Sequence, residues 1–181
     1  MIFTAIPLAG AYLVTAEPKV DARGFFARSW CREEARKHGI DVAWVQSNIS
    51  FSHRRGTLRG MHYQAPDWEA KLVRVTRGSI FDVIVDLRTS SPTYMQHFSV
   101  VLSADERNML FIPQGFAHGF LSLEDGTEIF YEMSEFYRPD QARGFRFDDP
   151  QFAIPWPSGE KILSDRDRSL PCYSPCADSV I

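Results

Sequence analysis

Apolar residues recur mostly at every second position along the chain, in short segments separated by residues that favour turns. In the clearest segment, 79–87, apolar side chains occupy one face while Asp82 and Asp86 interrupt the other. Such alternation predicts β-strands rather than helices. The same pattern predicts further strands at 43–51, 57–64, 70–76, 97–102, 109–112, 115–123 and 127–134.

Short strands spaced about every ten residues, with turn signals between them, predict an all-β antiparallel double-sheet sandwich or barrel. The chain lacks the alternating strands and helices of a Rossmann fold. One short peripheral helix is predicted over 31–38, with Ser29 near its start and Gly39 just past its end. After Pro139 the alternation weakens, and a polar tail is expected from about residue 168.

The composition fits one globular domain over residues 1–181, with 44% hydrophobic and 24% charged residues. Lys and Arg number 20 against 23 Asp and Glu, so no global positive field attracts nucleic acid or an anionic membrane. No apolar run approaches the roughly 18 residues of a membrane span. We therefore expect neither nucleic acid nor membrane as a partner.

The three cysteines, Cys31, Cys172 and Cys176, are too few and too scattered for a disulfide framework or a structural zinc site. No Lys or Arg precedes Lys19, so the positively charged start of a secretory signal is missing. These features predict a cytoplasmic protein.

Three polar residues interrupt strand faces that otherwise look buried. Lys71 shares a face with valines, His118 lies between two phenylalanines, and Tyr131 lies between Ile and Met at period two. A strand Tyr or His of this kind is also compatible with a hydrogen-bonded core residue. A buried Lys is less easily explained by structure alone, because ammonium groups are rarely buried unless paired or functional.

A second group of polar residues is distributed over two predicted strands. Gln46 and Asn48 point the same way on one strand, whereas strict alternation places Arg59 and His62 on opposite faces of the next. If Arg59 and His62 serve one pocket, Gly60 must mark a bulge or bend. The structural alternatives are a surface role for Arg59 and a hydrogen-bonded core role for His62.

The other reaction classes lack their motifs. The positions two before and two after His62 are Gly and Gln, so the close His pair with which small double-sheet barrels often hold a metal is absent. His62 with His118 gives too few metal ligands. No nucleophile elbow and no glycine-rich phosphate loop is present. Imidazole, phenol, ammonium and guanidinium groups without metal or cofactor suit proton transfer beside a carbonyl.

Eight motifs in order resemble those of the dTDP-4-dehydrorhamnose 3,5-epimerase family, from the first residues to about residue 168. They are DARGFF at 21–26, QSNIS at 46–50, LRGMHYQ at 58–64, AKLVRV at 70–75, DVIVDLR at 82–88, SPT at 91–93, IPQGFAHGF at 112–120 and LSDRD at 163–167. The resemblance implies a cupin-like jelly-roll barrel that forms a homodimer. It also implies action without metal or cofactor on a dTDP-linked 4-keto-6-deoxy sugar, inverted at C3 and C5.

The resemblance also implies roles for individual residues. His62 is expected to be the base with Asp167 as its partner, Lys71 to stabilise the enolate oxygen, and Tyr131 to be the acid on the opposite face of the ring. A phenol suits this role if an adjacent cation makes it more acidic. The positions expected to bind or line the substrate pocket are Arg23, Phe26, Gln46, Asn48, Arg59, His118 and Tyr137.

The chain departs from the family pattern at Arg28, at Glu69, where many members have Gln, and at Met95 and Gln96. These positions are expected to be peripheral to the chemistry. Four alternatives remain: an epimerase acting at C3 or C5 alone, a sugar-nucleotide-binding protein without activity, a metal-dependent cupin enzyme and a ketoisomerase.

Overall fold

The computed structural model describes residues 1–175; Cys176 lies outside them. The elements, in chain order, are β1 (Ile2–Ala5), β2 (Tyr12–Thr15), β3 (Lys19–Asp21), β4 (Gly24–Phe26), α1 (Arg32–Arg36), β5 (Gln46–Ser52), β6 (Leu58–Gln64), β7 (Lys71–Arg77), β8 (Ser79–Asp86), β9 (His97–Ser103), β10 (Asn108–Ile112), β11 (Phe116–Ser122), β12 (Thr127–Met133), β13 (Ala142–Gly144) and α2 (Asp165–Arg168).

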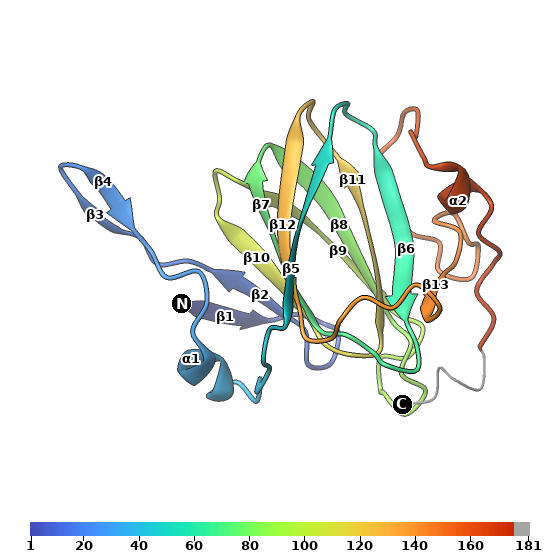
Figure 1. Cartoon of the computed structure of the whole chain (residues 1–181), viewed down its shortest axis with the longest axis horizontal. Helices are drawn as coiled ribbons and strands as arrows, with labels where there is room; N and C mark the ends of the chain where they lie inside the picture. Colours follow the sequence, from blue (N-terminus) through green and yellow to red (C-terminus); the bar gives the residue numbers. More distant parts are fainter. Residues whose placement is uncertain (176–181) are drawn as a thin grey trace.

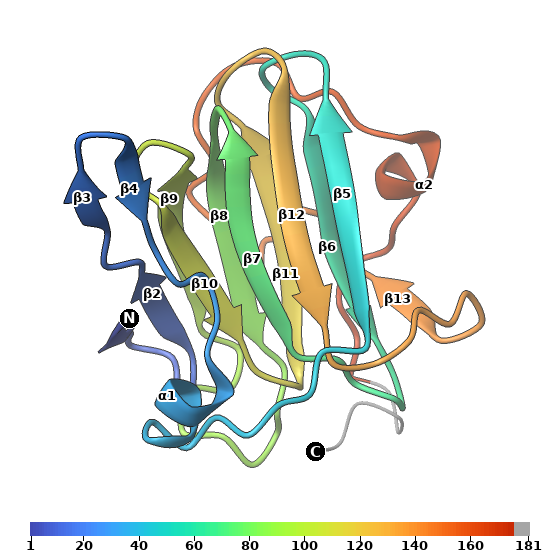
Figure 2. The same cartoon turned by 60° about the vertical axis from the view of Figure 1, so that its left-hand side comes forward.

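Two antiparallel sheets face each other (Figures 1 and 2). One has the strand order β1-β2-β10-β7-β12-β5 and the other β13-β6-β11-β8-β9. Neighbours such as β7 and β12 are far apart in sequence, as expected of a jelly roll. The predicted all-β double-sheet fold with short peripheral helices is confirmed.

The main hydrophobic core fills the space between the sheets. It combines side chains from both: Val73, Val75, Leu110, Ile112 and Ile129 from the six-stranded sheet, and Ile80, Ile84, Leu102, Phe116 and Phe120 from the five-stranded one. These residues occupy alternate strand positions, because every second side chain points inward. Apolar residues therefore recur at every second position of the sequence because these positions point into the space between the sheets.

The outer face of the five-stranded sheet is also covered. Phe145, Phe152 and Tyr173 pack over strand residues such as Val83 and Val85. The backbone N–H of Arg146 donates to the carbonyl of Pro171, two residues before Tyr173. The expected polar tail is thus packed at least as far as Tyr173, and β8 is buried on both faces.

A bend interrupts β6 at Gly60. The pairing register between β6 and β11 shifts here, and Gly60 has a φ of +118°. A Cβ at this position would lie 2.6 Å from the Cα of Gly119, so the close strand approach requires glycine. The bend that the sequence required for Arg59 and His62 to share a pocket is present.

The local predictions differ from the structure in three ways. Helix α1 is shorter than the predicted 31–38, and Cys31 rather than Ser29 stands at its N-cap, without a side-chain hydrogen bond. Helix α2 and the short strands β1 to β4 and β13 were not predicted. Strands of three or four residues carry too few alternating positions to be recognised.

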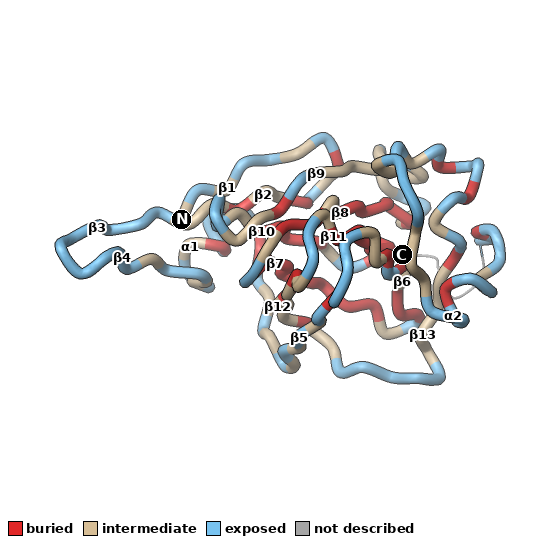
Figure 3. The backbone as a smooth tube through the Cα atoms, turned by 90° about the horizontal axis from the view of Figure 1, so that it is seen from above, coloured by how far each residue is buried: buried red, intermediate tan, exposed pale blue. Residues whose placement is uncertain are grey.

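The β3–β4 hairpin extends away from the barrel (Figure 1). All of its strand residues are exposed, whereas the central strands are buried (Figure 3). Among residues 1–175, no helix is long and apolar enough to cross a membrane.

Candidate active site

A cavity of about 470 Å³ lies between β5, β7 and β12 of one sheet and β6 and β11 of the other. This volume is within the usual range for small-molecule sites, about 300–1,000 Å³. Of the site residues predicted from the sequence, the structure brings nine together around this cavity: Gln46, Asn48, Arg59, His62, Lys71, His118, Tyr131, Tyr137 and Asp167.

His62 and Asp167 form a hydrogen-bonded pair at the cavity wall. Nε2 of His62 on β6 lies 2.7 Å from Oδ1 of Asp167 on α2. The Asp167 side chain is buried, whereas that of His62 is 40% exposed. Ser164 caps α2 by accepting a hydrogen bond from the Asp167 backbone N–H, which holds the helix start in place.

The Asp167 carboxyl favours its ionised form. Burial raises its pKa, but the hydrogen bond and charge of His62, together with hydrogen bonds from Ser164 and the Gly60 backbone, outweigh burial and hold the pKa below its ordinary value. A carboxylate on Nε2 fixes the orientation of the imidazole and leaves Nδ1 to exchange a proton. The pair therefore has the arrangement of a general base.

His118 and Asp82 form a second pair in the same sheet. Nε2 of His118 lies 2.9 and 3.1 Å from the two carboxylate oxygens of Asp82, and His118 is paired in register with His62. Asp82 interrupts a strand face, as the alternation indicates, and it is fully buried. It shares its face of β8 with Ile80 and Ile84, and that face is the barrel interior.

Lys71 lies at the start of β7 with only 7% of its surface exposed. Its Nζ forms an ion pair with Oε1 of Glu69, which is also buried. Both residues line the cavity. The expectation that Glu69 is peripheral is therefore wrong: the chain turns into β7 just after Glu69 and places its carboxylate against the cavity's buried cation.

Tyr131 reaches the cavity from β12, in the sheet opposite His62. Burial raises the pKa of its phenol; Arg59 opposes this effect and Glu69 adds to it. Arg59 is therefore an adjacent cation of the kind that the role of Tyr131 as the acid requires, but burial outweighs its effect on the pKa. The phenol keeps its proton at neutral pH, as a proton donor must.

Polar groups on β5 form another part of the wall. Nε2 of Gln46 donates to Oδ1 of Asn48 at 3.0 Å, and Oε1 of Gln46 accepts from the backbone N–H of Tyr137. Nη2 of Arg59 donates to the carbonyl of Phe51, which directs the exposed guanidinium across β5. A guanidinium and side-chain amides offer donors suited to phosphate and sugar oxygens.

A family model described as dTDP-4-dehydrorhamnose 3,5-epimerase matches residues 5–174. A dTDP-4-dehydrorhamnose 3,5-epimerase of Methanothermobacter thermautotrophicus is 42% identical over 170 residues, covering 92% of this chain and 91% of the relative. The chain belongs to the dTDP-4-dehydrorhamnose 3,5-epimerase family.

Solved structures of this epimerase family agree with the fold. The Bacillus anthracis enzyme, with TDP and PPi bound, is 40% identical with a TM-score of 0.92, covering 95% of this chain and 99% of the other. The Legionella pneumophila enzyme, in complex with dTDP-4-keto-L-rhamnose, is 35% identical with a TM-score of 0.87, covering 96% of this chain and 99% of the other.

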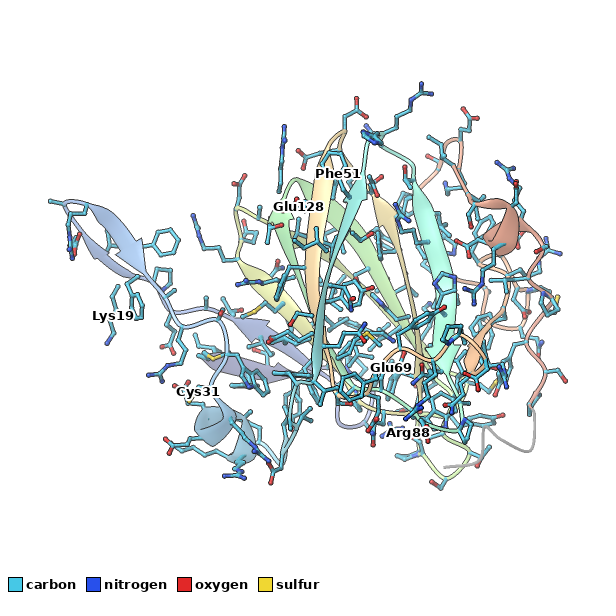
Figure 4. The ribbon with its side chains drawn as sticks, in the orientation of Figure 1. Lys19, Cys31, Phe51, Glu69, Arg88 and Glu128 are labelled. Carbon is cyan, nitrogen blue, oxygen red and sulfur yellow. The ribbon has the colours of Figure 1, made fainter. Side chains whose placement is uncertain are left out.

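Two predicted site residues lie away from the epimerase cavity. Arg23 and Phe26 belong to the projecting β3–β4 hairpin, and neither lines the cavity. Arg23 pairs with Asp21 of the same hairpin at 2.7 Å, and Phe26 is 73% exposed. In Figure 4 the hairpin residue Lys19 lies well apart from Glu69. One chain alone does not bring these residues to the site.

Several residues of the epimerase cavity were not predicted from the sequence. Besides Glu69, the cations Arg143 and Arg166 line the cavity. Arg143 lies on β13 and Arg166 on α2, neither of which has a recognisable alternating pattern. Within residues 1–175, no group of three or more His, Cys, Asp or Glu side chains could hold a metal ion.

Proposed function

We propose that this protein inverts C3 and C5 of dTDP-4-keto-6-deoxyglucose and produces dTDP-4-keto-L-rhamnose. The observation that carries the proposal is the placement of the His62–Asp167 pair and the Tyr131 phenol on opposite sheets across one cavity. Inversion of a carbon requires that a proton leave one face of the ring and return to the other. A base and an acid on facing walls meet that requirement.

Each inversion begins with removal of the proton beside the ketone. The second ring nitrogen of His62 takes the proton from C3 or C5, and the C–H electrons form a C=C bond as negative charge moves to O4. The buried ammonium of Lys71 stabilises that charge, since charge pairing is stronger where water is excluded. Asp167 stabilises the imidazolium that forms.

The proton returns from the opposite face. The Tyr131 hydroxyl donates its proton to the carbon, the C=O bond reforms, and the configuration is inverted. The phenolate is transient, and Arg59 is the cation that favours it. Solvent restores the phenol proton and removes the proton from His62.

We assign the nucleotide to the open side of the cavity. Arg59, Gln46 and Asn48 offer donors there for the diphosphate and the sugar, and His118 and Tyr137 line the wall. The TDP and PPi bound to the Bacillus anthracis relative support a nucleotide diphosphate as the ligand.

We further propose a homodimer in which the β3–β4 hairpin supplies Arg23 and Phe26 to the cavity of the partner copy. The hairpin's exposed apolar side chains, including Val20 at 79% and Phe26 at 73%, support this proposal. Co-expressed Arg23→Ala and Lys71→Met subunits test it, because a mixed dimer keeps one site with Lys71 and the other copy's Arg23. Activity above that of either variant alone is expected; no recovery contradicts the shared site.

We also propose that the enzyme works in the cytoplasm. Cys31 and Cys172 are both free thiols, which suits a reducing compartment.

The test of the epimerisation is incubation of the protein with dTDP-4-keto-6-deoxyglucose in heavy water, with C3 and C5 followed by NMR. Deuterium at both carbons, together with the L-rhamno product, is the expected result. Deuterium at one carbon identifies a single-site epimerase instead. Absence of deuterium at both carbons contradicts epimerisation of this substrate.

A further inference from the structure

The buried carboxylate of Glu69 has one oxygen without a partner. Oε1 bonds to Nζ of Lys71, whereas Oε2 is buried and has no hydrogen-bond partner among residues 1–175. Glu69 is only 6% exposed and lines the cavity. Figure 4 marks it in the region between β5 and β6.

A buried carboxylate oxygen without a donor is unfavourable, because such groups are bonded in most folded proteins. The side-chain amide of Gln64, which lines the same cavity, is already used. Its Nε2 has two N–H donors, and these bond to the backbone carbonyls of Asp67 and Phe136. A donor on a bound molecule would satisfy the free oxygen of Glu69.

Glu69 and Lys71 together present an acceptor beside a donor. An α-hydroxy ketone presents the complementary arrangement, with a carbonyl oxygen that accepts and an adjacent hydroxyl that donates. We propose that Glu69 accepts a hydrogen bond from the C3 hydroxyl of the substrate while Lys71 binds O4. Glu69 thereby selects 4-keto sugars that carry a hydroxyl beside the ketone.

This inference rests on the proposed function, since it uses Lys71 at O4. Two adjacent ring oxygens held at two points fix how the sugar lies between the sheets. The carbons beside the ketone are then presented to His62 in one orientation. Glu69 in this role contacts substrate and determines specificity without moving a proton.

The test compares dTDP-4-keto-6-deoxyglucose with its 3-deoxy analogue. Both carry a proton at C5, so kcat/KM for deuterium incorporation at C5 can be measured for each. A hydrogen bond to a charged group predicts that wild-type protein prefers the hydroxylated sugar by about 10- to 100-fold. The ratio isolates the hydroxyl contact, because a general loss of activity affects both substrates.

Three variants test whether Glu69 makes the contact with the C3 hydroxyl. Glu69→Met keeps an unbranched side chain but removes both oxygens, and the preference is expected to vanish. Glu69→Gln replaces a charged acceptor by a neutral amide and is expected to lower the preference several-fold. Glu132→Gln is the matched control: it lies next to Tyr131 on β12, outside the cavity, and is expected to leave the ratio unchanged.

Three results would overturn the proposal. They are equal use of the two sugars by wild-type protein, an unchanged preference in Glu69→Met, and a loss of preference in Glu132→Gln as large as that in Glu69→Met. If Glu69 only positioned Lys71, Glu69→Met would slow both sugars equally. Wild-type protein that exchanges neither sugar contradicts the proposed function itself, which separates the two failures.

Discussion

Two His–Asp pairs lie in the same sheet, yet their surroundings differ. His62 and His118 are register partners on β6 and β11, and each bonds to a buried carboxylate through Nε2. The His62 side chain is 40% exposed at the cavity wall, whereas that of His118 is only 10% exposed. The two pairs share their chemistry and differ in access.

Their carboxylates also come from different parts of the fold. Asp82 lies inside the barrel on β8, the neighbour of β11, whereas Asp167 reaches β6 from α2, 105 residues beyond His62. Asp82 is held in the core and fixes the orientation of His118 in the cavity wall. Asp167 lies on α2, outside the sheet, and orients His62, whose side chain stays accessible from the cavity. The difference in access supports the proposal that His62 removes the proton and that His118 shapes the cavity.

Loss of the accessible imidazole is expected to have the largest effect. His62→Ala removes the base and should lower the rate of deuterium exchange at C3 and C5 by about 10³-fold or more. His118→Ala should lower it far less, through poorer binding. Exchange rates measured by NMR for the two variants decide the matter, and the reverse order of effects would reassign the base.

Tyr131→Phe separates proton removal from proton return. The variant keeps His62 and Asp167, so exchange is expected to continue while inversion falls by about 10²-fold or more. The measurement counts deuterium and L-configured product in the same NMR sample. Inversion at the wild-type rate would show that another group returns the proton.

The two carboxylates provide a matched pair of substitutions. Asp167→Asn is expected to lower kcat by about 10²-fold while changing stability little, because the imidazole loses its partner at the cavity wall. Asp82→Asn should lower the free energy of unfolding by about 1–3 kcal/mol, since it disturbs a pair whose carboxylate is fully buried, and should change kcat less.

Steady-state kinetics and urea unfolding of both Asn variants measure these quantities. If Asp82→Asn reduced kcat more than Asp167→Asn, His118 rather than His62 would be the better candidate for the base. If both variants lost stability equally, the difference in burial would not distinguish the pairs.

The smallest expected effect is on stability in acid. The pKa of Asp167 is lower in the folded protein than in the unfolded chain, so its contribution is present above the unfolded pKa near 4 and is lost as pH falls through the folded pKa. The contribution is below about 1 kcal/mol, because the partner His62 is partly open to solvent.

Urea unfolding of wild-type protein and Asp167→Asn between about pH 5 and pH 2 tests this contribution. The difference in stability between the two proteins should shrink as the pH falls. A difference that grew on acidification would mean that the folded-state pKa of Asp167 is raised instead.

Much of the fold and part of the site follow from alternation in the sequence. The central strands were predicted because their inward positions are apolar, and Lys71, His118 and Tyr131 were noticed because they interrupt those positions. Asp167 came only from the family resemblance, since α2 has no alternating pattern and its contact with β6 is tertiary.

The sequence predicts that Glu69 is peripheral, because its position just before a strand carries no alternating signal that would reveal a buried charge. The alternation also does not show which face of the strand at 79–87 points inward, so the burial of Asp82 does not follow from it. The hairpin carrying Arg23 is another case: its residues contact solvent in one chain, and their proposed use depends on a second copy.

The central claim is that His62 and Tyr131 act on opposite faces of one sugar ring. A crystal structure of the protein with dTDP-4-keto-L-rhamnose tests it most directly. The expected complex has Nδ1 of His62 within about 3.5 Å of C3 or C5, the Tyr131 hydroxyl on the other side of the ring, and O4 at Lys71. A ring with both groups on the same face, or one placed against His118 and away from His62, would contradict the claim.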